Sequence, residues 1–261
     1  MTNHSLRPFP ARVLAMVTLV AIALTGTASA AQPASFSVGA PIVVASLASI
    51  VDGHFRTLED SLDLVAATSE ARSGDWARIK PLLERAGKAN VEAGLAYATP
   101  SGSFWTIAQG RQTVSIADRP YFKTAMTGKT VVAEMVLSRT TGRPVANIAV
   151  PVKDASGKVT GVVIAAVYLD SLSKLVQQEM ALDSHDIFFS FNANALVGLN
   201  WDQKQIFLEA RKLSPDIDRA FGQMLAHDSG VESYTHRGAT RTVVYRKSSY
   251  TGWWYAFGVV R

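Results

Sequence analysis

The chain of 261 residues is long enough for one large domain or two small ones. Hydrophobic residues make up 48% of it and charged residues 18%, which excludes wholesale disorder and predicts a packed core. The absence of cysteine excludes disulfides, cysteine-ligated metals and thiol nucleophiles. The formal net charge of +5 is small and scattered, so it does not indicate a nucleic-acid partner.

The first thirty residues, 1–30, have the organisation of a secretory signal peptide. Arg7 and Arg12 precede an apolar run over 13–24, and Ala28-Ser29-Ala30 supplies small residues for cleavage. We expect cleavage after Ala30 and a periplasmic location for the rest of the chain. An uncleaved membrane anchor is the less favoured alternative, because the apolar run is shorter than the roughly 20 residues that span a bilayer.

Residues 31–90 predict an N-terminal helical region. From Pro41 onward, apolar residues recur at steps of three or four along one helix face: Leu47, Val51, Phe55, Leu58, Leu62 and Val65. This stripe predicts a core-facing helix, and the alternative is a coiled-coil seam that would permit a homodimer. Ser73-Gly74-Asp75 ends the helix, Asp75 is a candidate cap for a second helix, and Pro81 is expected to kink that helix.

Residues 91–180 alternate between predicted strands and short helices. We expect strands over 91–98, 103–107, 131–138, 144–152 and 159–168, and helices over 118–126 and 170–179. Short turns between the last three strands predict antiparallel pairing. Residues 181–261 repeat this order, with strands over 187–192, 195–199, 232–237, 240–247 and 253–260 and a mainly helical segment over 206–225. The predicted class is α+β, with a long N-terminal helix packed on two tandem antiparallel sheets.

Two central strands have one apolar and one mixed face. Over 131–138, one face holds Val131, Ala133, Met135 and Leu137, and the other holds Val132, Glu134, Val136 and Ser138. Over 144–152, one face holds Ala146, Ile148, Val150 and Val152, and the other holds Val145, Asn147 and Ala149. Because side chains alternate across a strand, the apolar faces should take the long helix. The mixed faces either line a cavity or face solvent.

Five short motifs follow one another through the first unit. They are Asp118-Arg119-Pro120-Tyr121-Phe122, Ser138-Arg139-Thr140-Thr141-Gly142-Arg143-Pro144, Ala149-Val150-Pro151-Val152, Asp154-Ala155-Ser156-Gly157-Lys158 and Gly161-Val162-Val163. In order and spacing they resemble the extracytoplasmic Cache domain, the PAS-like sensor of bacterial chemoreceptors, histidine kinases and diguanylate cyclases. Together with the long helix and Gly252-Trp253-Trp254-Tyr255, they are similar to the double Cache arrangement. This resemblance implies a membrane-distal-type ligand-binding subdomain over 91–180 and a smaller membrane-proximal-type subdomain over 181–261.

The resemblance also implies a ligand pocket beside the segment that holds Arg119 and Tyr121. These two residues match positions that often hold a ligand carboxylate in the family, and a guanidinium binds a carboxylate through two parallel hydrogen bonds. Trp105 would supply a further apolar wall, and Ser138 and Asn147 would add polar groups from the mixed faces.

Two of these residues have alternative roles. Arg119 could pair with Glu134 or Asp118 inside the protein, which would leave it unavailable to a ligand. Trp105 could belong to the core.

The sequence departs from the family pattern in two ways. Amino-acid-binding members hold the ligand's ammonium group with acidic residues, and the matching positions here are Ser138 and Ala166. Their loss disfavours an amino acid and favours a small carboxylate or another anion. Family receptors also continue into a membrane helix and an output module, whereas this sequence ends at its last predicted strand. We therefore expect it to signal through a partner such as a membrane receptor or kinase.

No motif indicates catalysis. Ser171-Leu172-Ser173-Lys174 has the Ser-x-x-Lys spacing of penicillin-recognising enzymes, but the sequence lacks their Ser-Asp-Asn and Lys-Thr-Gly companions. The five histidines have no tight metal-binding spacing, and no phosphate-binding glycine loop occurs. We expect a periplasmic small-molecule-binding sensor that is not an enzyme, with no metal and no cofactor. The alternatives are a solute-scavenging or delivery protein for a transporter and a ligand-free interaction module.

Overall fold

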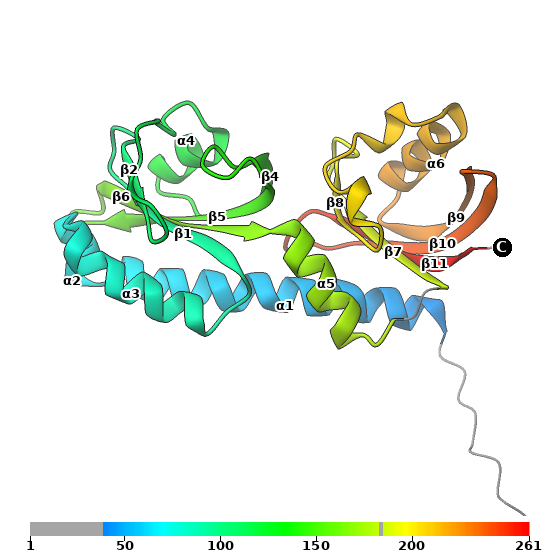
Figure 1. The fold of residues 1–261 in the computed structure, drawn as a ribbon, viewed down its shortest axis with the longest axis horizontal. Helices are drawn as coiled ribbons and strands as arrows, with labels where there is room; N and C mark the ends of the chain where they lie inside the picture. The colour runs from blue at the N-terminus through cyan, green and yellow to red at the C-terminus, as the bar shows by residue number, and fades with distance from the viewer. Residues whose placement is uncertain (1–38, 183–184, 261) are drawn as a thin grey trace, which may run out of the picture. The chain divides into compact units, whose positions relative to one another are not determined.

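The computed structural model describes residues 39–182 and 185–260 (Figure 1). The predicted signal peptide lies outside these residues. None of the helices within the described ranges is long and apolar enough to span a bilayer.

One long helix, α1 (Ala40–Ala66), contacts strands of both sheets of the fold. Its buried face contains all six residues of the predicted apolar stripe, which confirms the core-facing helix. The same residues are therefore not available as a coiled-coil seam. Pro41 lies in the first turn, where its missing N–H leaves no hydrogen bond unmade.

Two shorter helices follow, α2 (Ser69–Ser73) and α3 (Trp76–Lys88). Gly74 ends α2 in the left-handed conformation, with φ of 70°, which glycine adopts without a Cβ clash. The Asp75 carboxylate then accepts a hydrogen bond of 3.0 Å from the Ala77 N–H and caps α3, as its position in the sequence predicted. Pro81 lies inside α3.

The first sheet is antiparallel and has the strand order β3-β2-β1-β6-β5-β4. Its strands are β1 (Ala93–Ala98), β2 (Phe104–Thr106), β3 (Gly110–Arg111), β4 (Val131–Leu137), β5 (Pro144–Lys153) and β6 (Val159–Tyr168). The two-residue strand β3 was not predicted. Helix α1 covers one face of this sheet, and α4 (Pro120–Met126) covers the other (Figure 1). The apolar face of β5 packs with α1 as predicted.

A β-bulge changes the faces predicted for β4. The register shifts between Val131 and Glu134, and Ala133 has φ of 59°. A bulge inserts one extra residue, so alternation by two is interrupted there. Val131 therefore packs on the α4 side and Val132 on the α1 side, the reverse of the prediction.

The second sheet is also antiparallel, with the order β8-β7-β11-β10-β9. Helix α5 (Leu169–Glu179) leads to its strands, β7 (Asp186–Phe191), β8 (Val197–Asn200), β9 (Ser229–His236), β10 (Ala239–Lys247) and β11 (Trp254–Val260). The expected fold class, α+β with two antiparallel sheets and a long N-terminal helix, is confirmed.

The segment 206–225 is less helical than predicted. It contains the 3₁₀ turn η2 (Ala210–Lys212), follows the turn η1 (Gln203–Gln205), and becomes α-helical only in α6 (Pro215–Ala226). Ser214 caps α6 by accepting a hydrogen bond from the Ile217 N–H, and Pro215 occupies the first turn. Phe207 has φ of 70°, which no α-helix accommodates. The apolar periodicity therefore reflects packing of successive short elements.

Candidate functional site

A cavity of about 640 Å³ lies on the α4 side of the first sheet. Its walls come from the end of α3, from β1 and the loop after β2, from the segment before α4, and from the turn between β4 and β5. The residues used in the argument below are Lys88, Glu92, Arg119, Tyr121, Ser138 and Asn147. A volume of this size accommodates a small metabolite.

Small residues of the sheet floor leave the hollow open. Gly94 on β1 pairs with Ala166 on β6, and Ala166 pairs with Asn147 on β5, so the three lie in one row across the sheet. Directly paired residues of neighbouring strands point to the same face. Gly94 and Ala166 contribute little volume to that face, so α4 and the loops cannot fill it completely.

Asn147 is a buried polar residue at the centre of this floor. Only 3% of it is exposed, and its side chain lines the cavity. Among residues 39–182 and 185–260, no group hydrogen-bonds to its amide. An amide without a partner is costly to bury, so a group inside the cavity, such as a ligand or solvent, must satisfy it.

Arg119 immediately precedes α4, where Pro120 starts the helix. Its Nη2 donates a hydrogen bond of 3.1 Å to the carbonyl of Leu137, which also lines the cavity. It forms no ion pair with any acidic residue in the described part of the chain, so the alternative pairing with Glu134 or Asp118 is wrong. Most of its donors remain free for an anion.

Asp118 is instead paired with Arg139, which lies in the turn after β4. Arg139 Nη1 donates to Asp118 Oδ1 at 2.6 Å, and its Nη2 donates to Oδ2, so the contact is bidentate. Arg139 also donates to the Ser115 carbonyl. The hydrogen bonds from Arg139 lower the pKa of Asp118 from 3.8 to about 2. The pair ties together the two loops that border the cavity.

Tyr121 lies in the first turn of α4 and is buried against the sheet. Burial raises the pKa of its hydroxyl to about 12, so the group is a neutral hydrogen-bond donor at physiological pH. Burial also raises the pKa of the nearby Glu134, while a hydrogen bond from the Tyr121 backbone N–H opposes that change.

Ser138 is in the cavity wall, but its hydroxyl is engaged in its own turn. Its Oγ lies 3.1 Å from the Thr140 hydroxyl and accepts a hydrogen bond of 3.3 Å from the Thr141 N–H. The residue shapes the turn that carries Arg139 and has one remaining position for a ligand contact.

Trp105 is not among the residues that line the cavity, so its predicted place in the wall is wrong. It lies on β2 and packs on the α1 side, with the Arg111 guanidinium carbon 5.8 Å from the centre of its ring. Its neighbours Phe104 and Thr106 line the cavity because side chains alternate along a strand. Alternation along β2 puts Phe104 and Trp105 on opposite faces of the sheet. Once the face that holds the site is known, alternation therefore indicates Phe104.

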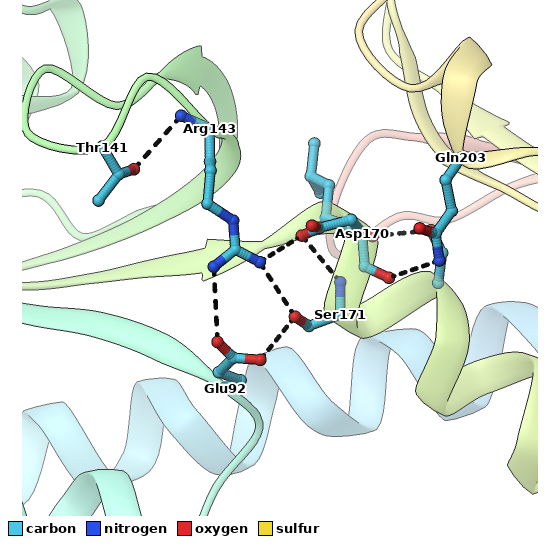
Figure 2. A network of polar contacts seen from close by, with 8 residues as sticks. Glu92, Thr141, Arg143, Asp170, Ser171 and Gln203 are labelled. Carbon is cyan, nitrogen blue, oxygen red and sulfur yellow. Dashed lines mark hydrogen bonds and ion pairs between the residues drawn. The ribbon is translucent and has the colours of Figure 1, made fainter.

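Sequence reasoning also missed a network at one edge of the cavity, centred on Arg143 (Figure 2). The Arg143 guanidinium carbon lies 3.7 Å from the centre of the Tyr168 ring, which lines the cavity. Its Nη2 donates to Asp170 Oδ1 at 2.7 Å, and its Nη1 lies 3.5 Å from Glu92 Oε1. Ser171 Oγ donates to Glu92 Oε2 at 2.6 Å.

The network reaches η1, the turn that follows β8 of the second sheet, through the amide of Gln203. Gln203 Nε2 donates a hydrogen bond of 3.5 Å to the Asp170 carbonyl at the start of α5 (Figure 2). The cavity edge is therefore connected through α5 to the turn that follows β8.

Comparison with known proteins identifies relatives of this arrangement. Residues 34–261 match the family model described as Cache domain. Sporulation kinase D of Bacillus subtilis is 37% identical over 95 residues, which cover 36% of this chain and 17% of the kinase. The match thus spans a small part of that kinase.

Two solved structures share the fold. The extracellular domain of rpHK1S-Z16, named as a histidine kinase, has a TM-score of 0.70 at 16% identity and covers 84% of this chain and 92% of that one. The ligand-binding domain of the Pseudomonas fluorescens chemoreceptor CtaA, in complex with L-alanine, has a TM-score of 0.63 at 19% identity. That match covers 85% of this chain and 94% of the chemoreceptor domain.

Proposed function

This chain belongs to the Cache domain family of ligand-binding sensor domains, and from this premise we propose that it binds a small carboxylate in the cavity beside Arg119. The observation that carries the proposal is the pair of unsatisfied groups there. The Arg119 guanidinium has no acidic partner in the described chain, and the buried Asn147 amide has no hydrogen-bond partner. A carboxylate accepts hydrogen bonds from both groups and neutralises the guanidinium.

The remaining charges around the cavity favour an anion over an amino acid. Lys88 has no ion-pair partner among the described residues. The acidic lining residues are already engaged: Glu84 lies 3.6 Å from Lys80, and Glu92 pairs with Arg143 and Ser171. A ligand's ammonium group would have to compete for these carboxylates. Amino acids are nevertheless the right comparison, because CtaA holds L-alanine.

We place this binding in the periplasm and infer that it is relayed to a signalling partner such as a membrane receptor or kinase. The Arg143 network supports a relay because it joins the cavity edge to α5 and η1. A ligand that contacts Tyr168 or Glu92 differently from solvent would change the fraction of molecules in which this network is formed. We infer a binding function without catalysis.

Calorimetric titration of the full chain with succinate and with L-alanine tests the proposal. We expect saturable succinate binding, and a loss of about tenfold or more in affinity for Arg119→Met, because charge-assisted hydrogen bonds are removed. Arg111→Met is the matched control, since Arg111 stacks on Trp105 outside the cavity. Binding of L-alanine alone would contradict the carboxylate proposal, and no binding of either compound would favour a scaffold role.

Asn147→Leu separates a binding role from a structural one. The substitution removes an amide that no described residue satisfies, so the melting temperature should stay the same or rise. Succinate affinity should fall because the cavity loses a donor and gains an apolar group. A large loss of stability would mean that Asn147 serves the fold.

A further inference from the structure

A second hollow lies in the second sheet, at the place equivalent to the first cavity. It has a volume of about 20 Å³ and lies between the sheet and α6, with walls from η1 and η2. In both sheets, a helix precedes the last strands of the unit and covers the face opposite α1 (Figure 1). This space is far too small for the metabolite proposed above.

Arg241 on β10 lines this hollow and is an unpaired buried charge. Only 8% of the residue is exposed, and its Nε has no hydrogen-bond partner. No carboxylate in the described ranges lies within ion-pair distance of it. The centre of the Trp201 ring, 5.7 Å from the guanidinium carbon, offers a weak attraction only. Buried charges are normally paired, because removing an ion from water is expensive.

Two carboxylates that follow or precede lining residues closely in sequence, Asp202 next to Trp201 and Glu232 near Tyr234, are engaged with other arginines. Asp202 lies 3.4 Å from Arg237, and Glu232 lies 2.7 Å from Arg219. Of the described residues that line the hollow, none is acidic. The protein therefore leaves the charge of Arg241 for something else to neutralise.

Two other polar lining residues, Asn200 and Tyr234, offer donors. The Asn200 Oδ1 already accepts a hydrogen bond of 2.9 Å from the Asp202 N–H, which leaves its NH₂ group for the hollow. The Tyr234 residue pairs directly with Arg241 across β9 and β10, so both side chains point to this face. The Gln205 Nε2 is already engaged, because it donates to Asp202 Oδ2 and lies 3.3 Å from His236 Nε2. The Tyr234 oxygen accepts a hydrogen bond from Arg241, which leaves its O–H proton as a second donor beside the Asn200 NH₂ group. A guanidinium with two further donors on the same face is suited to an anion.

We propose that the second sheet binds one small monovalent anion, of the size of chloride or formate, against the Arg241 guanidinium. The anion neutralises the buried charge and accepts a hydrogen bond from Nε. The volume admits a single small ion and excludes dicarboxylates. A water molecule could accept the same hydrogen bond but would leave the charge uncompensated. The site is separate from the cavity at Arg119, so the two proposals stand or fall independently.

Thermal denaturation of the full chain tests the site. Sodium gluconate, whose anion is too large for the hollow, is replaced stepwise by sodium chloride or sodium formate at constant ionic strength. We expect a saturable rise in melting temperature for the wild type and for Arg119→Met, and no such rise for Arg241→Met. In gluconate alone, Arg241→Met should melt no lower than the wild type, because it removes an unpaired buried charge. An equal rise in Arg241→Met would overturn the proposal.

A measurement on the wild type covers the case in which Arg241→Met does not fold. Crystals soaked in sodium bromide should show an anomalous peak within hydrogen-bond distance of the Arg241 guanidinium. Density for water alone, or no peak at this place, would overturn the proposal.

Discussion

Asp118 and Arg139 determine how two loops that border the cavity are held. Their bidentate contact joins the segment before α4 to the turn after β4. Arg119 follows Asp118 directly, so the pair positions the free guanidinium without neutralising it. Of these two adjacent residues, Asp118 therefore forms an internal ion pair, whereas Arg119 forms none among the described residues.

The pKa of Asp118 gives a prediction for acid conditions. Because its folded pKa of about 2 is below the ordinary 3.8, the pair stabilises the fold above pH 3.8 and loses this effect as the pH falls toward 2. A carbon-detected NMR titration should show a carboxyl midpoint near 2, which Arg139→Gln should move toward 3.8. A wild-type midpoint near 3.8 would mean that the pair does not form in solution.

At the scale of elements, α1 acts as a shared core for both sheets. Phe55 is fully buried and packs edge-on against Trp253, with ring centres 5.5 Å apart. The Trp253 indole N–H donates a hydrogen bond of 3.1 Å to the carbonyl of Ala133 on β4. The Asp52 carboxylate accepts hydrogen bonds from Ser248 at 2.6 Å and from Tyr255 at 3.2 Å. The helix, the β4 bulge and the last strands therefore depend on one another.

Truncation of the α1 stripe should destabilise the fold strongly. Phe55→Ala is expected to lower the free energy of unfolding by about 3–5 kcal/mol, because it leaves a cavity beside Trp253. Leu64→Ala on the same helix is the matched control: its side chain is exposed, and a change within about 0.5 kcal/mol is expected. Urea denaturation measures both variants. Equal effects would show that the stripe does not carry the packing assigned to it.

At the scale of the whole molecule, the Arg143 network gives the cavity a polar connection to η1, the turn that follows β8 of the second sheet. It passes from Tyr168 and Glu92 through Asp170 to Gln203. The ion pairs are partly exposed, so each stabilises the fold only modestly. Because each contact is weak, the network can break and re-form between two conformations of the protein without unfolding it.

Arg143→Gln should loosen this connection without unfolding the protein. Hydrogen exchange of the amides over 169–173 and 203–205 should increase a few-fold, while the amides of β10 and β11 keep their protection. Arg139→Gln is the matched control, since it breaks an ion pair on the other side of the cavity. If both substitutions accelerate exchange at 203–205 alike, the network is not the connection.

The sequence predicted most strands, the α1 stripe and the Asp75 cap, because each depends on local periodicity or local hydrogen bonding. It misplaced Val131 and Val132, because the bulge reverses which side chains face α1, and the order of apolar residues in the sequence does not reveal a bulge. It misassigned 206–214, where Phe207 turns the chain although the apolar spacing resembles that of a helix.

By itself, the sequence determined the fold class, the family resemblance and four residues that line the cavity: Arg119, Tyr121, Ser138 and Asn147. The tertiary structure alone decided that Trp105 faces away and that Asp118 takes Arg139 as its partner. It also revealed that Arg241 is buried without a carboxylate. Periodicity and motifs are properties of neighbouring residues, whereas pairing and burial depend on which distant segments meet.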